Sequence, residues 1–196
     1  MVSTLRFRRP IGGIRMRKIA IVVSSLAVVV LAAAGSPLLA QQDKSKRPSP
    51  PATAKCELAG GKTVTIDYSS PRKRGRNVFP DVVKYGAVWR TGANEATTFV
   101  TTGDVTVGSA RVPAGSYTLF TLPGKDKWTL IISKKTGEWG TDYPGEKEDL
   151  ARVEMKAGTA SAPVENFTIS FEKAGNGCNL TLAWDTTTAS VTVEAM

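Results

Sequence analysis

The sequence predicts an all-β fold: an antiparallel β-sandwich of eight or nine strands, with a β-barrel as the alternative. Two observations support this prediction. From residue 57 onward apolar and polar residues alternate with a period of two; in residues 63–68, for example, Val64, Ile66 and Tyr68 share one face. The runs are also short and rich in β-branched and aromatic residues, and Gly, Pro, Asn or Asp separates them.

Each expected strand ends at a turn signal. The run at residues 97–102 stops before Gly103-Asp104, and Gly108-Ser109 connects two short runs in the manner of a hairpin. Further runs lie at residues 116–122, 128–133, 152–156, 166–172, 179–184 and 190–194. We expect helix only as short turns near residues 81–88 and 146–150, because no segment has a long helical period.

The first 40 residues are interpreted as a signal peptide, so we expect a periplasmic or secreted protein with no membrane span after cleavage. Met16-Arg17-Lys18 precedes an apolar stretch at residues 19–34, and small residues follow up to Ala40, the expected cleavage site. The alternative is an uncleaved anchor, although the stretch is short for a span of about 20 residues. Either Met1 or Met16 fits as the first residue.

Residues 41–55 read as a polar, Pro-rich linker, and residues 56–196 as a single β-sandwich domain. The formal net charge of +9 comes from the segment before residue 56, because residues 56–196 carry equal numbers of acidic and basic side chains. A nucleic-acid partner is therefore not expected. The chain has no histidine, which excludes Ser-His-Asp and Cys-His catalysis and every His-ligated metal site.

The chain has two cysteines, Cys56 and Cys178. An exported chain with an even number of cysteines favours a disulfide, which would join the start of the domain to a late strand. The alternative is a pair of buried free thiols.

Three stretches are not explained by strand formation alone. They are residues 68–79, residues 83–97, and residues 113–120 followed by 128–132. The second stretch ends with the sequence Trp89-Arg90-Thr91-Gly92-Ala93-Asn94-Glu95-Ala96-Thr97. Together they resemble a bacterial exported family known as domain of unknown function 2911, over about residues 60–193. The resemblance implies an exported β-rich domain and no established activity. Pro80 departs from the family, which usually has Gly after the residue matching Phe79.

The segment 89–97 is the main candidate for a ligand-binding site. It concentrates Trp89, Arg90, Asn94 and Glu95, which offer an aromatic face, a guanidinium donor, an amide and a carboxylate. Such a mixture suits recognition of a small polar ligand. The alternative is structural: an internal Arg90–Glu95 ion pair would fix the loop, and Asn94 would bind the backbone.

Two further residues join the candidate site. Tyr68 begins the first of the three stretches, and Arg76 ends the basic run at residues 72–76 and is expected to fold back toward the Arg90–Glu95 loop. The run itself suits phosphate, a sulfated glycan or anionic lipid, or else it is a solvated loop.

We expect a domain that binds a small polar ligand or an envelope component, and no cofactor or metal. The acids at residues 146–149 lack the alternating spacing of a calcium loop. A purely structural envelope protein is the first alternative. The second is an enzyme that uses a carboxylate such as Glu95 or Asp67, and we lean against it because the sequence shows no acid–base pair.

Overall fold

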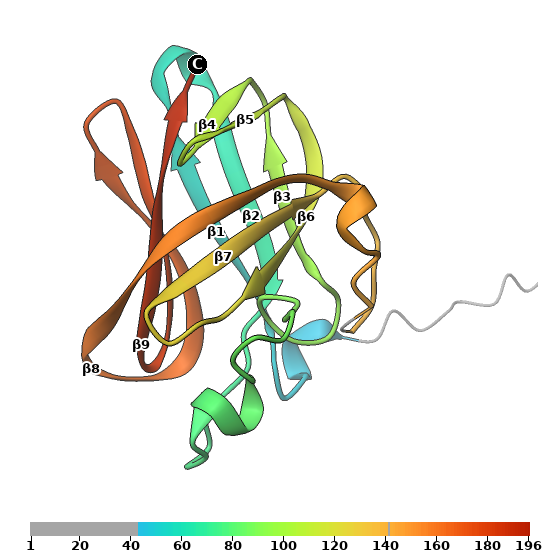
Figure 1. Ribbon diagram of the computed structural model, residues 1–196, viewed down its shortest axis with the longest axis vertical. Helices are drawn as coiled ribbons and strands as arrows, with labels where there is room; N and C mark the ends of the chain where they lie inside the picture. Colours follow the sequence, from blue (N-terminus) through green and yellow to red (C-terminus); the bar gives the residue numbers. More distant parts are fainter. Residues whose placement is uncertain (1–42, 141) are drawn as a thin grey trace, which may run out of the picture. The chain divides into compact units, whose positions relative to one another are not determined.

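The computed structural model describes residues 43–140 and 142–196, which form an all-β structure (Figure 1). The expected signal peptide at residues 1–40 lies outside these residues. The strands of the described part are β1 (Pro51–Glu57), β2 (Thr63–Ser69), β3 (Thr97–Thr101), β4 (Val105–Val107), β5 (Ala110–Val112), β6 (Gly115–Leu122), β7 (Lys127–Ser133), β8 (Asp149–Ala174) and β9 (Gly177–Ala195). Its short helical turns are η1 (Lys44–Lys46), η2 (Ala59–Gly61), η3 (Val78–Val82) and η4 (Glu146–Glu148).

All strand pairs are antiparallel, and they follow one hydrogen-bonded order, β1-β2-β3-β6-β7-β8-β9-β4-β5. The predicted all-β antiparallel fold is therefore confirmed. Within the described residues the strands form one open sheet with edges at β1 and β5, in place of two separate sheets or a closed barrel. The sheet curves enough for β1 to pack against β8 and β9.

The long strands β8 and β9 make this curvature possible. Each takes up two of the predicted short strands, and Figure 1 shows both as long curved ribbons. β8 pairs with β7 along its first part and with β9 along the rest, and the β8–β9 register shifts between Thr159 and Thr168. Irregularities of this kind bend a strand, so β8 can pair with β7 at one end and with β9 along the rest of its length.

The folded part of the chain begins before residue 56. β1 starts at Pro51 and is antiparallel to β2: Pro51 lies opposite Ser69, and Glu57 lies opposite Thr63. It therefore includes residues of the predicted linker. Proline is tolerated here because it is the first residue of an edge strand. The segment lacks a strong apolar alternation, which is why its pairing is not visible in the sequence.

The predicted disulfide joins Cys56 of β1 to Cys178 of β9, with 6.4 Å between the two Cα atoms. Both cysteines are buried. Lys173 of β8 donates to the backbone carbonyl of Glu57 at 2.7 Å near the same place. The disulfide thus connects an edge strand to a strand with which it shares no ladder of hydrogen bonds.

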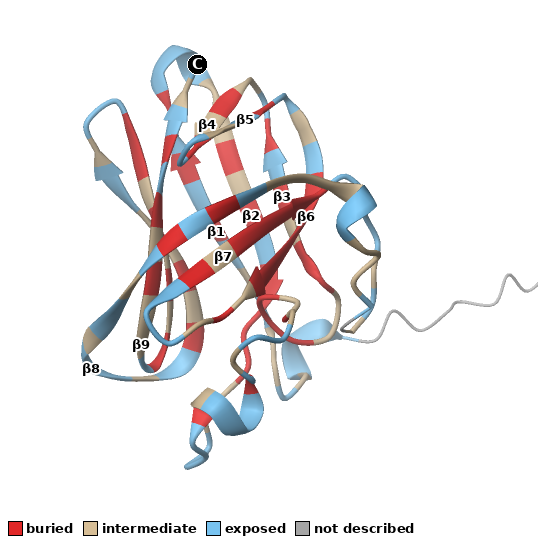
Figure 2. Cartoon of the chain, in the orientation of Figure 1, coloured by how far each residue is buried: buried red, intermediate tan, exposed pale blue. Residues whose placement is uncertain are grey.

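Apolar side chains are buried on both faces of β6 and β7, as the red ribbons of these strands show in Figure 2. The main core lies on one face, and a smaller cluster around Phe120 and Ile131 lies on the other. Val88, from the loop before the candidate segment 89–97, and Tyr143, from the connection between β7 and β8, pack against the smaller cluster. These loops therefore cover part of the second face of the sheet, over β6 and β7.

Candidate functional site

The segment 89–97 is a loop that leads into β3 and pairs with β6 at both of its ends. Trp89 and Thr121 of β6 exchange both backbone hydrogen bonds at 2.8 Å, and the chain returns to β6 at Thr97, which pairs with Leu119. Thr91 and Asn94 have positive φ angles of 56°, which reverse the chain between these two anchors. The loop is therefore fixed at both ends by the sheet.

Gly92 allows this loop to lie against the end of β2. A Cβ atom at Gly92 would come within 3.0 Å of the Ser69 carbonyl oxygen. The neighbouring Ala93 N–H donates to the same oxygen at 3.2 Å. A larger residue at position 92 would separate the loop from β2, so glycine is needed here for close approach.

Trp89 belongs to the core and is not available to a ligand. Its side chain is buried and stacks on Trp184, with 5.9 Å between ring centroids and 18° between planes. Phe167 packs edge-on against it at 4.9 Å. The indole N–H donates to the Gly92 carbonyl at 3.1 Å. The structure thus places Trp89, which the sequence suggests as an aromatic face for a ligand, in the core.

Asn94 and Glu95 contact part of the predicted linker. We call residues 43–50 the N-terminal strap. Asn94 donates to the Ser49 carbonyl at 3.1 Å. The Glu95 carboxylate accepts from Arg47 at 2.9 and 3.0 Å and pairs with Lys44 at 3.1 Å. The loop and the strap therefore hold each other in place.

The Arg90–Glu95 ion pair of the structural alternative is not formed within the described residues, because Glu95 faces the strap and pairs with its two cations. Arg90 is half-buried, and its Nε atom has no hydrogen-bond partner in this part of the chain. Burial lowers the pKa of Arg90. The two residues are close in sequence, but the turn between them directs their side chains to different neighbours.

Arg76 does not fold back toward the segment 89–97. It is exposed, and its guanidinium donates to the carbonyls of Lys73 at 3.0 Å and Arg72 at 2.7 Å. Short-range bonds to its own turn outweigh the expected contact with Glu95.

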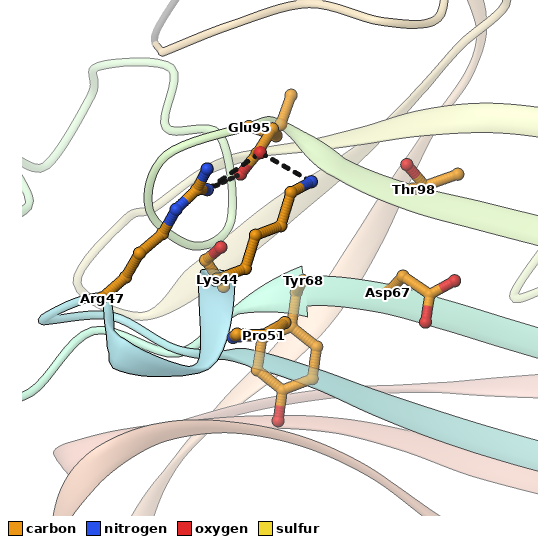
Figure 3. Close-up of a pocket in the computed structure, with 9 residues that line it drawn as sticks. Lys44, Arg47, Pro51, Asp67, Tyr68, Glu95 and Thr98 are labelled. Carbon is orange, nitrogen blue, oxygen red and sulfur yellow. Dashed lines mark hydrogen bonds and ion pairs between the residues drawn. The ribbon is translucent and has the colours of Figure 1, made fainter. Parts of the chain in front are cut away.

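A hollow of about 220 Å³ lies between the strap and the ends of β2 and β3, and we call it the Glu95 hollow. Figure 3 shows Lys44 and Arg47 reaching Glu95 from the strap, with Asp67 and Thr98 along the adjacent strands. Its lining consists of Lys44, Arg47, Pro51, Asp67, Tyr68, Ser69, Glu95, Ala96 and Thr98. Among the predicted site residues, the hollow thus brings together Tyr68 and Glu95.

Tyr68 lines the hollow with its ring directed toward the core. Its hydroxyl accepts from the Ile169 backbone N–H at 3.0 Å, and Figure 3 shows this hydroxyl pointing away from Glu95. Burial raises the pKa of Tyr68, so it stays a neutral phenol. The tyrosine therefore shapes the wall of the hollow and does not offer its hydroxyl to the interior.

Sequence reasoning missed Lys44, Arg47 and Thr98 as residues of this hollow. The sequence suggests Asp67 only as a possible catalytic carboxylate. It lies opposite Thr98 in the β2–β3 ladder and accepts from the Thr53 hydroxyl at 2.5 Å. A predicted pairing of β2 with β3 would have placed Asp67 opposite Thr98. The approach of Lys44 and Arg47 to Glu95 depends on how the strap folds onto the sheet, which no local sequence pattern encodes.

Glu95 is held in its ionised form. Burial opposes ionisation, but the Glu95 backbone N–H, Arg47 and Lys44 outweigh burial and lower the pKa of Glu95 to about 2. The carboxylate is therefore charged over the whole physiological range. It is a strong hydrogen-bond acceptor but a weak base and a poor proton donor at neutral pH.

The Glu95→Gln variant is expected to lose part of the acid sensitivity of the wild type. Because the pKa of Glu95 is lower in the folded than in the unfolded chain, its stabilising effect is complete above about pH 4.5 and is lost as the pH falls toward 2. The carboxylate is more than one-third exposed, so we expect about 1 kcal/mol. Urea unfolding between pH 2 and 7 measures this difference.

The matched control is Glu172→Gln, at an exposed carboxylate of β8 without an ion pair in the described part of the chain. It should keep the pH dependence of the wild type. Equal curves for wild type and Glu95→Gln would contradict the role given to the strap contact.

Comparison with known proteins gives one family. Residues 49–193 match the family described as "Protein of unknown function (DUF2911)", a match that covers almost all of the nine-stranded sheet. Neither a curated protein nor a solved structure matches the chain. The resemblance seen in the segment 89–97 and its neighbours is thus confirmed, and the chain belongs to the DUF2911 family.

Proposed function

We propose that this chain is an exported cell-envelope protein whose β domain binds a small polar ligand in the Glu95 hollow. Two features support export: the signal-like sequence that ends at Ala40, and a buried disulfide of the kind that persists in oxidising compartments. In residues 43–140 and 142–196 no helix is long and apolar enough to cross a membrane.

The observation that carries the binding proposal is the fixed charge arrangement at Glu95. Two cations of the strap hold the carboxylate, while Asp67 and Thr98 add acceptors and a hydroxyl to the same hollow. Binding sites use a few polar groups in fixed positions to orient a ligand. The volume of about 220 Å³ is below the range of about 300–1,000 Å³ for drug-sized ligands, so we infer a small ligand.

A structural role is the second candidate, and a specific observation favours it. Asn94 and Glu95 both form hydrogen bonds with the strap, and Trp89 is buried in the core. In this alternative the polar residues of the segment 89–97 fasten the N-terminus to the sheet, and the hollow has no ligand.

Carboxylate catalysis is less well supported. The hollow contains Asp67 and Glu95, but glycoside chemistry needs one carboxyl group with a raised pKa to donate a proton. The pKa of Glu95 is instead lowered to about 2. A ligand held by an ionised Glu95 agrees better with this arrangement.

Thermal-shift screening separates the two main candidates. If the hollow binds a ligand, at least one compound among monosaccharides, nucleotides, short peptides and lipids should raise the melting temperature, because a ligand of the native state stabilises it. The Asp67→Asn variant should fold and lose this response.

The matched control is Asp126→Asn, a change of the same chemistry at an exposed turn. It should respond to the same compound as the wild type. A panel with no effect on the wild type, together with a lowered melting temperature for Glu95→Gln, would favour the structural role and reject the binding proposal.

A further inference from the structure

The basic run at residues 72–76 is built into a tight turn. Arg74 and Gly75 have positive φ angles of 51° and 70°, and the Arg76 N–H donates to the Lys73 carbonyl at 3.2 Å. Turns of this shape favour Asn or Gly at the first of these positions. An arginine in this conformation is uncommon and has an energetic cost, which suggests that its side chain has a use here.

This turn is attached to β8 and β9. Lys73 and Arg74 donate backbone N–H bonds to the carbonyl and carboxylate of Glu165, both at 2.8 Å. The Lys73 ammonium turns inward and pairs with Asp185 at 2.5 Å. The lysine of the run thus serves the fold, and the arginines on either side of it are left for another role.

Neutral oxygens hold the three guanidinium groups of the run. Arg72 donates to the Ser70 hydroxyl at 3.2 Å, and Arg74 donates to the Pro48 carbonyl at 3.3 Å. Arg76 donates to two carbonyls of its own turn. These bonds restrict the side chains without compensating their charge.

The three arginines border a common hollow of about 400 Å³, which we call the arginine hollow. Its lining consists of Pro48, Ser49, Pro71, Arg72, Arg74 and Arg76, and it includes no carboxylate. Elsewhere in the described chain Arg47, Arg111 and Arg152 each pair with a carboxylate.

The positive charge of this hollow is local. Residues 56–196 contain equal numbers of acidic and basic residues, so an excess of cations at one place is not a consequence of overall composition. Glu165, which contacts the turn, accepts from a backbone N–H and forms no ion pair with a guanidinium of the run. Three adjacent arginines that form no ion pair with a carboxylate in the described part of the chain favour an anionic ligand.

We propose that the arginine hollow is a phosphate-binding site, distinct from the Glu95 hollow. A phosphate group presents three acceptor oxygens and up to two negative charges, so it can accept from several guanidinium groups at once. Guanidinium groups match phosphate in geometry as well as in charge. The phosphate is either a small soluble anion or the headgroup of an anionic lipid, since both present the same group.

Calorimetric titration with inorganic pyrophosphate at low ionic strength tests this site, using protein purified after expression of the full chain. The wild type should bind. Arg74→Gln should weaken binding at least about tenfold, because it removes charge-assisted hydrogen bonds. The triple variant Arg72→Gln, Arg74→Gln, Arg76→Gln should show no measurable binding. Arg74→Gln keeps the backbone bonds of the turn, so it remains informative if the triple variant does not fold.

A matched control removes the same charge elsewhere: Lys84→Gln, Lys125→Gln and Lys156→Gln change three exposed lysines. This variant should bind pyrophosphate like the wild type. Equal loss of binding in the control and the triple arginine variant would show general electrostatic attraction and overturn the proposal.

Sedimentation with vesicles distinguishes the two sources of phosphate. Vesicles of phosphatidylglycerol and phosphatidylcholine are compared with vesicles of phosphatidylcholine alone. Pyrophosphate binding without vesicle binding assigns the site to a soluble phosphate, and arginine-dependent binding to the anionic vesicles assigns it to a lipid headgroup. If the wild type binds neither probe, the site is rejected, whatever the outcome at the Glu95 hollow.

Discussion

Replacing both Cys56 and Cys178 by alanine is expected to lower the free energy of unfolding by about 2–5 kcal/mol. The disulfide spans 122 positions of sequence, and the chain-entropy description gives roughly 4–5 kcal/mol for a loop of that size. Both sulfur atoms lie in the core, so the variant also loses packing there. Urea unfolding of the wild type and the double variant measures the difference.

The effect should concentrate at β1. Among the described strands β2 is the only hydrogen-bonded neighbour of β1, and the disulfide connects β1 to β9. Amide hydrogen exchange in residues 51–57 should therefore increase more than exchange in β6 or β7, which lie in the middle of the sheet.

The control for this prediction is a reducing agent. Dithiothreitol should destabilise the wild type and leave the double alanine variant unchanged. Protein recovered from the periplasm or the medium after expression of the full chain should have no titratable thiol. Two titratable thiols in that native protein would contradict the disulfide.

Trp89→Ala is expected to destabilise the protein by about 3–5 kcal/mol. The variant removes a buried indole that contacts Trp184 and Phe167, and it leaves a cavity that these rings cannot fill. It also leaves the Gly92 carbonyl without its indole donor. Thermal and urea unfolding measure the effect.

Trp139→Ala is the matched control, since Trp139 is 57% exposed and lies beside Glu95 in the backbone pairing. Its free energy of unfolding should change by less than about 0.5 kcal/mol. Similar small effects for the two variants would show that Trp89 is not part of the core.

Local sequence patterns predict most of the strands because a strand with one buried face must alternate apolar and polar residues. Residues 63–68 show this pattern and form most of β2, whereas residues 116–122 are buried on both faces and are identified as a strand by their β-branched and aromatic residues. The same patterns do not reveal β1, which has little apolar alternation, or the joining of short runs into β8 and β9. These features depend on pairing between distant strands, which is decided by the curvature of the whole sheet.

The candidate site shows the same division. Composition singles out the segment 89–97 as a candidate ligand-binding site, but in the structure Glu95 contacts Lys44 and Arg47 and forms no ion pair with Arg90. The Arg47–Glu95 contact joins positions 48 residues apart. Closeness in sequence favours a contact only when the backbone between two residues allows it, and here the loop turns them apart.

By itself, then, the sequence determined the all-β class, the pairing of the only two cysteines and the family, because periodicity, composition and motif are properties of the chain alone. Only the tertiary structure decided which side chains share a surface: the strap that reaches Glu95, the core position of Trp89 and the three arginines around one hollow. The physical reason is that these contacts bring together segments far apart in the chain, so their energy depends on the folded positions of strands and turns and not on any local pattern.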